Sequence, residues 1–118
     1  MSETNNRKYP LAGIRIVDLT NVIAGPVSTR VLAQLGAEVI KIEVPWGRAI
    51  GNIAMHTANP GEERPYNKVA SFNEVNRGKR SIAIDLVHEE GRTLLRELIS
   101  VSDVAIENYS PRVMGNLG

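Results

Sequence analysis

The chain has 118 residues, of which 42% are hydrophobic and 23% charged, enough for one soluble globular domain. Fourteen lysines and arginines nearly balance thirteen acidic residues, so a net charge of +1 gives no basic field for nucleic acid or a membrane surface. The absence of cysteine excludes disulfides, thiolate metal sites and cysteine nucleophiles. No apolar run approaches the ~18 residues of a membrane-spanning helix. We therefore expect a cytoplasmic protein.

The first part of the chain has the pattern of a strand, a helix and a second strand. Residues 1–10 are polar and predict a disordered leader. Residues 14–19 and 39–43 are β-branched, apolar runs that are typical of buried parallel strands. Between them Pro26 suits a first helical turn, and Gly36 is placed to end the helix. This order predicts a βαβ unit.

The periodic pattern is lost between residue 44 and about residue 71, where prolines and glycines interrupt every candidate element. Further strands are expected at residues 81–86 and 104–107, and further helices at residues 89–101 and from Pro111 onward. The buried face of the longer helix is expected at Leu94, Leu95, Leu98 and Val101. The alternation predicts an α/β fold with a doubly wound, Rossmann-like parallel sheet.

Three segments carry a family resemblance: VDLTNVIAGP at residues 17–26, NRGKRSIAIDL at 76–86 and DVAIENY at 103–109. Together they resemble the N-terminal part of the family III coenzyme A transferases, a group that includes formyl-CoA:oxalate and carnitine CoA-transferases and α-methylacyl-CoA racemases. The resemblance covers the chain from about residue 11 to its end. It implies that residues 11–118 are an incomplete N-terminal CoA-binding α/β domain, and that the full-length protein is a homodimer of interlocked chains.

The resemblance also implies a reaction, the transfer of coenzyme A from an acyl-CoA thioester to a carboxylic acid. In the family an aspartate attacks the thioester carbonyl, forms a mixed anhydride with the enzyme and frees the CoA thiolate. That aspartate is expected beyond Gly118, so we expect no catalytic residue in this chain and no transferase activity from it alone. Coenzyme A is then a substrate, and no tightly bound cofactor is expected.

Ligands of open parallel sheets bind beyond the carboxyl ends of the strands. Three loops are expected there, at residues 20–25, from residue 44 onward and at residues 107–110. In the first loop Gly25 either lets the backbone approach a ligand closely or only turns the chain into its helix. By the resemblance, the positions that contact coenzyme A are Val22, Ile23, Ala24, Ile84, Asp85, Asn108, Tyr109 and Ser110. Ile23 stands where some members have a polar amide, which argues against the oxalate-specific branch.

Other polar residues have two interpretations each. Asn108 and Tyr109 could hold an adenine by hydrogen bonding and stacking, or could form a turn with Tyr109 packed on the last helix. Arg77, Lys79 and Arg80 could form a solvated turn or attract the phosphates of coenzyme A. By contrast, Asp18 and Asp85 are expected to hold loops through backbone N–H groups. Neither His56 nor His88 has a partner cluster at metal-ligand spacing, so no metal site is expected.

Three other functions stay open from the sequence alone. The same scaffold could racemise a 2-methylacyl-CoA. A dinucleotide-binding domain would use Glu43 to bind a ribose, but the G-x-G-x-x-G pattern is absent from the first loop. A non-catalytic nucleotide-binding module would keep the ligand site without the reaction.

Overall fold

The computed structural model describes residues 9–44 and 70–117. Its four strands are β1 (Arg15–Asp18), β2 (Glu38–Glu43), β3 (Arg80–Ala83) and β4 (Val104–Ile106). They form one sheet in the order β3-β2-β1-β4, and every pair of neighbours is parallel. The predicted parallel sheet is confirmed, and its strand order is that of a Rossmann-type fold. The aperiodic stretch expected from residue 44 lies almost entirely outside the described residues, as do residues 1–8 of the expected leader.

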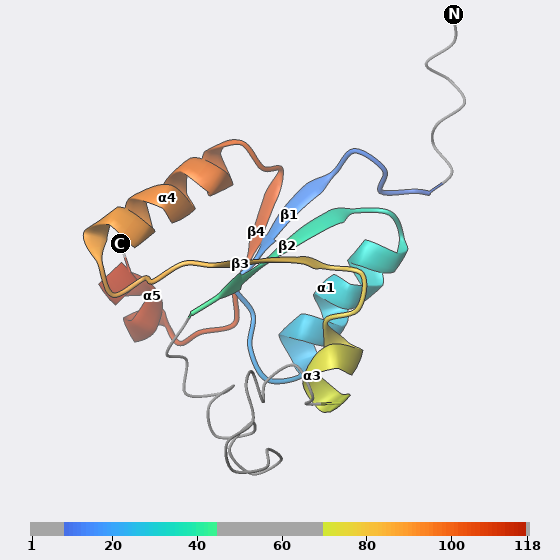
Figure 1. The fold of residues 1–118 in the computed structure, drawn as a ribbon, viewed down its shortest axis with the longest axis horizontal. Helices are drawn as coiled ribbons and strands as arrows, with labels where there is room; N and C mark the ends of the chain where they lie inside the picture. The colour runs from blue at the N-terminus through green and yellow to red at the C-terminus, as the bar shows by residue number, and fades with distance from the viewer. Residues whose placement is uncertain (1–8, 45–69, 118) are drawn as a thin grey trace, which may run out of the picture.

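Helices cover both faces of the sheet (Figure 1). On one side lie α1 (Ala24–Gln34) and α3 (Ala70–Val75), and on the other lie α4 (Glu89–Ser100) and α5 (Pro111–Leu117). The sheet is therefore doubly wound, as the sequence predicts. Gly36 follows α1 with a φ of +101°, a left-handed conformation that favours glycine and ends the helix.

Helix α3 is not predicted by the sequence. It has six residues, none of them buried, and so it has no apolar stripe that a periodicity could reveal. Its position is set by contact with α1, where the guanidinium of Arg30 pairs with the carboxylate of Glu74 at 2.5 Å. A helix this short depends on tertiary contacts because isolated short helices are marginal in water.

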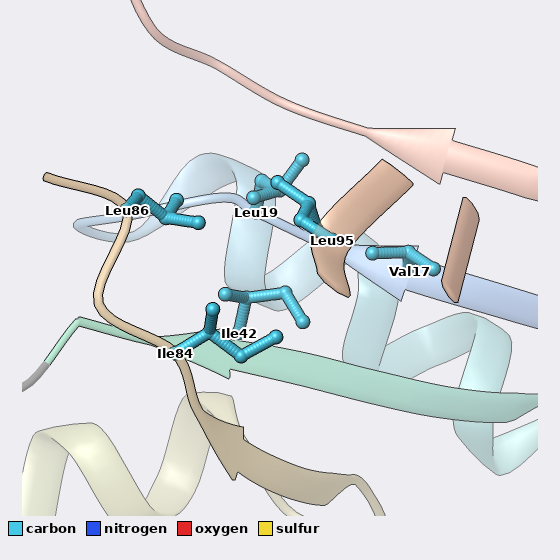
Figure 2. Close-up of a cluster of buried hydrophobic side chains, with 6 residues drawn as sticks. All are labelled: Val17, Leu19, Ile42, Ile84, Leu86 and Leu95. Atoms are coloured by element: carbon cyan, nitrogen blue, oxygen red, sulfur yellow. The ribbon is translucent and has the colours of Figure 1, made fainter. Parts of the chain in front are cut away.

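The larger part of the core lies between the sheet and α4. Its six buried side chains are Val17, Leu19, Ile42, Ile84, Leu86 and Leu95 (Figure 2). Tyr109 and Leu117 pack against this cluster from the C-terminal segment. A second cluster of Ile16, Ala37 and Val39 has Leu32 and Ala33 of α1 packed against it. Adjacent residues of β1 thus point to opposite faces, as in any strand.

The predicted buried face of α4 is partly wrong. Leu95 is buried and Leu98 half-buried, but Leu94 is 56% exposed and Val101 64%. The rotation of the helix is set by Gly91, which is buried against the backbone of Asp85. Gly91, Leu95 and Leu98 share one helical face at i, i+4 and i+7, and Leu94 lies about 100° around the helix from Leu95.

Gly91 offers a direct test of this close packing. A Cβ atom on Gly91 would lie 1.9 Å from the carbonyl oxygen of Asp85, so Gly91→Ala should lower the free energy of unfolding by about 1–3 kcal/mol. Gly115 in α5 has no atom within 4 Å of an added Cβ. Gly115→Ala should therefore be neutral or stabilising by about 0.5–1 kcal/mol. Urea denaturation measures both, and a Gly91→Ala protein as stable as the wild type would contradict the packing.

Candidate functional site

The parallel strands place the ends of β1 and β4 side by side at one edge of the sheet. The strand order reverses between these two strands, because β2 and β3 lie to one side of β1 and β4 to the other. Open α/β folds bind ligands at such a reversal, beyond the carboxyl ends of the strands. Two of the three loops that the sequence singled out, at residues 20–25 and 107–110, begin there, and the loop from residue 44 lies almost entirely outside the described residues.

Side-chain hydrogen bonds tie these two loops together. The backbone N–H of Asn21 donates to Oδ1 of Asn108 at 2.8 Å, and Nδ2 of Asn108 donates to the backbone carbonyl of Asn21 at 2.9 Å. Nδ2 of Asn21 in turn donates to the hydroxyl of Tyr109 at 2.5 Å. The role of Asn21 cannot be predicted from the residues around it, because its partners lie 87 and 88 residues away.

Asn108, Tyr109 and Ser110 each make hydrogen bonds to other residues of the protein. The amide of Asn108 holds the main chain of Asn21, although the residue as a whole is exposed. The Tyr109 ring is half-buried and packs on the core beneath α4. Ser110 is exposed directly before α5, and its carbonyl accepts the N–H groups of Val113 and Met114.

Val22, Ile23 and Ala24 form an exposed segment at the start of α1. Val22 is 73% exposed and Ile23 64%. Val22 has a φ of +69°, a left-handed conformation that costs a β-branched residue about 1–3 kcal/mol. Ile23 is the N-cap of α1, and its apolar side chain makes no hydrogen bond to the N–H groups of the first turn.

Gly25 has a packing role in the structure. A Cβ atom on Gly25 would lie 2.3 Å from Cβ of Thr20, so only glycine lets the start of α1 pack against the end of β1. The sequence offered a close approach to a ligand or a simple turn into the helix as the role of Gly25. The structure adds a third role, a close contact between Gly25 and the Thr20 side chain.

Ile84 and Asp85 lie elsewhere along the same edge, after β3. The Ile84 side chain is buried in the core, and Oδ1 of Asp85 accepts the backbone N–H of Val87 at 3.0 Å, which confirms the predicted loop-holding role of Asp85. Both residues border a pocket of about 410 Å³ between β3 and α4, together with His88 and Leu94. The structure therefore divides the eight predicted contact residues between this pocket and the joined loops after β1 and β4.

The strongest electrostatic feature of this edge is a buried ion pair that joins Asp18 to Lys79. Nζ of Lys79 lies 2.9 Å from Oδ2 of Asp18, and the two side chains are 2% and 0% exposed. Lys79 also donates to the carbonyl of Pro26 at 2.9 Å and to Oδ1 of Asn76 at 2.8 Å. Lys79 is therefore neither solvated nor free to meet a phosphate, and both interpretations of the basic cluster are wrong for this residue.

Arg77 and Arg80 remain exposed on either side of Lys79. Arg77 pairs with Glu74, and Arg80 pairs with Glu38. A sequence pattern cannot separate these arginines from Lys79, because the three cations share the same local composition. Lys41 is a clearer sign of a buried polar site, because it lies between Ile40 and Ile42 in the middle of β2.

Further donors complete the environment of Asp18. Its Oδ1 accepts the backbone N–H of Thr20 at 2.9 Å and the Thr20 hydroxyl at 2.5 Å, and its Oδ2 accepts the Thr29 hydroxyl at 2.7 Å. Burial by itself would raise the pKa of Asp18, but the hydrogen bonds from Thr20, Lys79 and Thr29 outweigh it, so the pKa lies below its ordinary value.

Lys41 is the second buried cation of this edge. It lies opposite Asp18 in the register of β1 and β2, and its Nζ donates to the carbonyl of Thr20 at 2.7 Å. Burial lowers the pKa of Lys41, and the charges of Asp18 and Glu43 oppose that shift. Burial likewise lowers the pKa of Lys79, against its hydrogen bond to Asp18.

Within residues 9–44 and 70–117, no group of three or more His, Cys, Asp or Glu side chains could hold a metal ion. In the same residues no helix is long and apolar enough to cross a membrane.

The buried ion pair predicts very different effects for two neighbouring substitutions. Lys79→Met leaves the Asp18 carboxylate buried without its paired cation, and should lower the free energy of unfolding by about 3–5 kcal/mol. Arg80→Met removes the same charge from an exposed pair with Glu38, and should cost less than ~1 kcal/mol. Urea denaturation at neutral pH compares them, and equal losses would contradict the burial of the pair.

The lowered pKa of Asp18 predicts a loss of stability in acid. The carboxylate stabilises the fold fully above its unfolded pKa of about 3.9, and this contribution is lost as the pH falls through the lower folded value. Asp18→Asn removes the titration, so its free energy of unfolding should fall less steeply between about pH 5 and about pH 2. Parallel pH profiles for the two proteins would show that Asp18 is not the titrating group.

Comparisons with known proteins agree with this architecture. A family model, CoA-transferase family III, matches residues 11–118. The chain is 44% identical over 113 residues to the succinate--glutarate CoA-transferase of Agrobacterium fabrum, covering 92% of this chain and 27% of that protein. It is 41% identical over 119 residues to the succinyl-CoA:glutarate CoA-transferase of Homo sapiens, covering 99% and 25%.

A solved structure has the same fold. The crystal structure of a CAIB/BAIF family protein from Brucella suis superposes with a TM-score of 0.76 at 38% identity, over 92% of this chain and 28% of that chain. The chain thus spans about a quarter of the length of the relatives it matches. Because the family model covers nearly all of the sequence, the chain belongs to CoA-transferase family III.

Proposed function

We propose that this chain supplies the N-terminal, coenzyme A-binding part of an enzyme that transfers coenzyme A from an acyl-CoA thioester to a carboxylic acid. The observation that carries the proposal is that two of the segments with the family resemblance meet where the strand order reverses, joined through Asn21, Asn108 and Tyr109. The family match over residues 11–118 and relatives named as CoA-transferases of succinate, glutarate and oxalate support the same reaction class.

The eight candidate residues then divide the ligand between them. The exposed apolar segment Val22, Ile23 and Ala24 suits the uncharged pantetheine arm, which carries the reacting thioester. The nucleotide of coenzyme A is proposed to contact Asn108, Tyr109 and Ser110. Its adenosine part is proposed to contact also Ile84 and Asp85, which border the pocket between β3 and α4.

The reaction is proposed to proceed through an enzyme aspartate. Its carboxylate attacks the thioester carbonyl, the carbon–sulfur bond breaks, and coenzyme A leaves as a thiolate with a mixed anhydride remaining on the enzyme. The thiolate then attacks the aspartyl carbonyl, releasing the first acid and leaving an aspartyl-CoA thioester. The acceptor carboxylate attacks this thioester in turn, which frees the thiolate and forms a second mixed anhydride. The thiolate then attacks the acceptor's carbonyl in this anhydride, forms the new acyl-CoA and expels the aspartate as a carboxylate.

None of the aspartates of this chain suits that role. The sequence has three of them, Asp18, Asp85 and Asp103. Asp18 is buried and paired, Asp85 accepts the Val87 N–H, and Asp103 accepts the Arg15 N–H at 2.8 Å. We therefore propose that the nucleophile belongs to sequence outside residues 1–118. We further propose that the whole enzyme is homodimeric and cytoplasmic.

Calorimetric titration tests the ligand. We expect the chain to bind coenzyme A and not NAD. Val22→Asp places a charge in the proposed pantetheine segment and should raise the dissociation constant at least about tenfold, or ~1.4 kcal/mol. Val31→Asp makes the same change at an exposed position on α1 and should leave it unaltered. Binding of NAD instead of coenzyme A would favour a dinucleotide-binding domain.

A chimera tests the reaction and does not depend on the folding of the chain alone. This chain replaces the matching segment of the Agrobacterium fabrum relative, which supplies the remainder of the enzyme. We expect the chimera to transfer coenzyme A between succinate and glutarate, and hydroxylamine in the presence of acyl-CoA to inactivate it at one aspartate. A soluble chimera that only exchanges the α-proton of a 2-methylacyl-CoA would favour a racemase.

A further inference from the structure

Asn21 is the point at which the paired strands β1 and β4 give way to the loops of the candidate site. The last backbone hydrogen bond between the two strands runs from the N–H of Leu19 to the carbonyl of Ile106 at 2.9 Å. Two residues further along, the side-chain amide of Asn108 pairs with both the N–H and the carbonyl of Asn21. This amide acts as a neighbouring strand would, and extends the pairing past the end of β4.

The fixed residue directly precedes the strained one. Val22 has a φ of +69° and turns the chain outward, so that Val22 and Ile23 are the exposed residues. A β-branched residue does not adopt this conformation unless its surroundings hold it there. The side chain of Asn21 supplies a further restraint, because its Nδ2 donates to both the Leu19 carbonyl at 3.3 Å and the Tyr109 hydroxyl at 2.5 Å.

We infer that Asn21 is a positioning residue, which holds the segment Val22–Ile23–Ala24 in its outward conformation through Asn108 and the hydroxyl of Tyr109. The inference rests on the proposed function, since it assumes that this segment receives coenzyme A. It gives Tyr109 a role different from stacking on an adenine: the hydroxyl acts on Asn21, while the ring packs on the core.

Two substitutions separate these roles. Tyr109→Phe keeps the ring, its packing and any stacking face, and removes only the hydroxyl that accepts from Asn21. Asn21→Ala removes the same hydrogen bond from the other side. If Asn21 positions the loop, each single variant should raise the dissociation constant for coenzyme A about three- to tenfold, and the double variant no further than the worse single one. Gln34→Ala, at an exposed position at the far end of α1, should match the wild type.

Amide hydrogen exchange in the ligand-free chain is the readout that a general loss of stability would not reproduce. The N–H of residue 21 donates to Asn108, and the N–H of Val27 donates to the Ile23 carbonyl. Both should exchange faster in Asn21→Ala and Tyr109→Phe, while amides in the middle of α4 exchange at the wild-type rate. Unchanged exchange at residue 21 and Val27, or Tyr109→Phe with wild-type affinity, would overturn the inference.

The two proposals fail in different ways. If the wild-type chain does not bind coenzyme A, the proposed function fails, and the exchange rates at residue 21 and Val27 alone decide whether Asn21 positions the segment. Should the isolated chain not fold, the same variants in the Agrobacterium fabrum chimera provide the test. There, loop positioning should raise KM for acyl-CoA with little change in kcat. An equal loss of soluble chimera in both variants, with unchanged KM in what remains, would overturn it.

Discussion

The ion pair between Asp18 and Lys79 is the interaction on which the arrangement of the candidate site depends. It joins the end of β1 to the residue that precedes β3, and Lys79 also binds the carbonyl of Pro26 in α1. Burying two charges is costly, and the cost is offset only where each remaining hydrogen-bonding group has a partner. Thr20 and Thr29 complete the shell of Asp18. The pair therefore fixes β1, α1 and the start of β3 relative to one another, provided that Thr20, Thr29 and the Pro26 carbonyl supply the remaining hydrogen bonds.

The segment Val22–Ile23–Ala24 stands between two such polar anchors. Beneath it the Asp18 network fixes Thr20 and the first turn of α1, and beside it Asn108 fixes Asn21. An exposed, apolar segment buries little surface, and its valine is in a strained left-handed conformation, so its own side chains do not stabilise this arrangement. Rigid supports on both sides explain how such a conformation persists at the protein surface.

Much of the fold follows from the sequence, because the strands and long helices leave periodic apolar patterns. What could not be predicted depends on contacts between distant segments. The rotation of α4 follows from the space that Gly91 leaves for the Asp85 backbone. The apolar pattern alone therefore predicted, wrongly, that Leu94 is buried. Lys79 and Arg80 are adjacent cations with opposite environments, which their composition cannot reveal. The positions matched to the family could be named from the sequence. The contacts of Asn21 with Asn108 and Tyr109 could not, because they depend on how two distant loops meet in space.

The internal contacts of Asn108 and Tyr109 do not exhaust their hydrogen-bonding groups. A side-chain amide has two N–H donors and two acceptor lone pairs, and Asn21 takes one of each from Asn108. The Tyr109 hydroxyl accepts from Asn21, and among residues 9–44 and 70–117 its own proton is left to donate. Because Asn108 is exposed, its remaining groups can meet a ligand while the others hold the loop. A residue that is fixed by the protein on one side and open on the other binds with little loss of side-chain freedom. Positioning and ligand contact are therefore compatible at the same two residues.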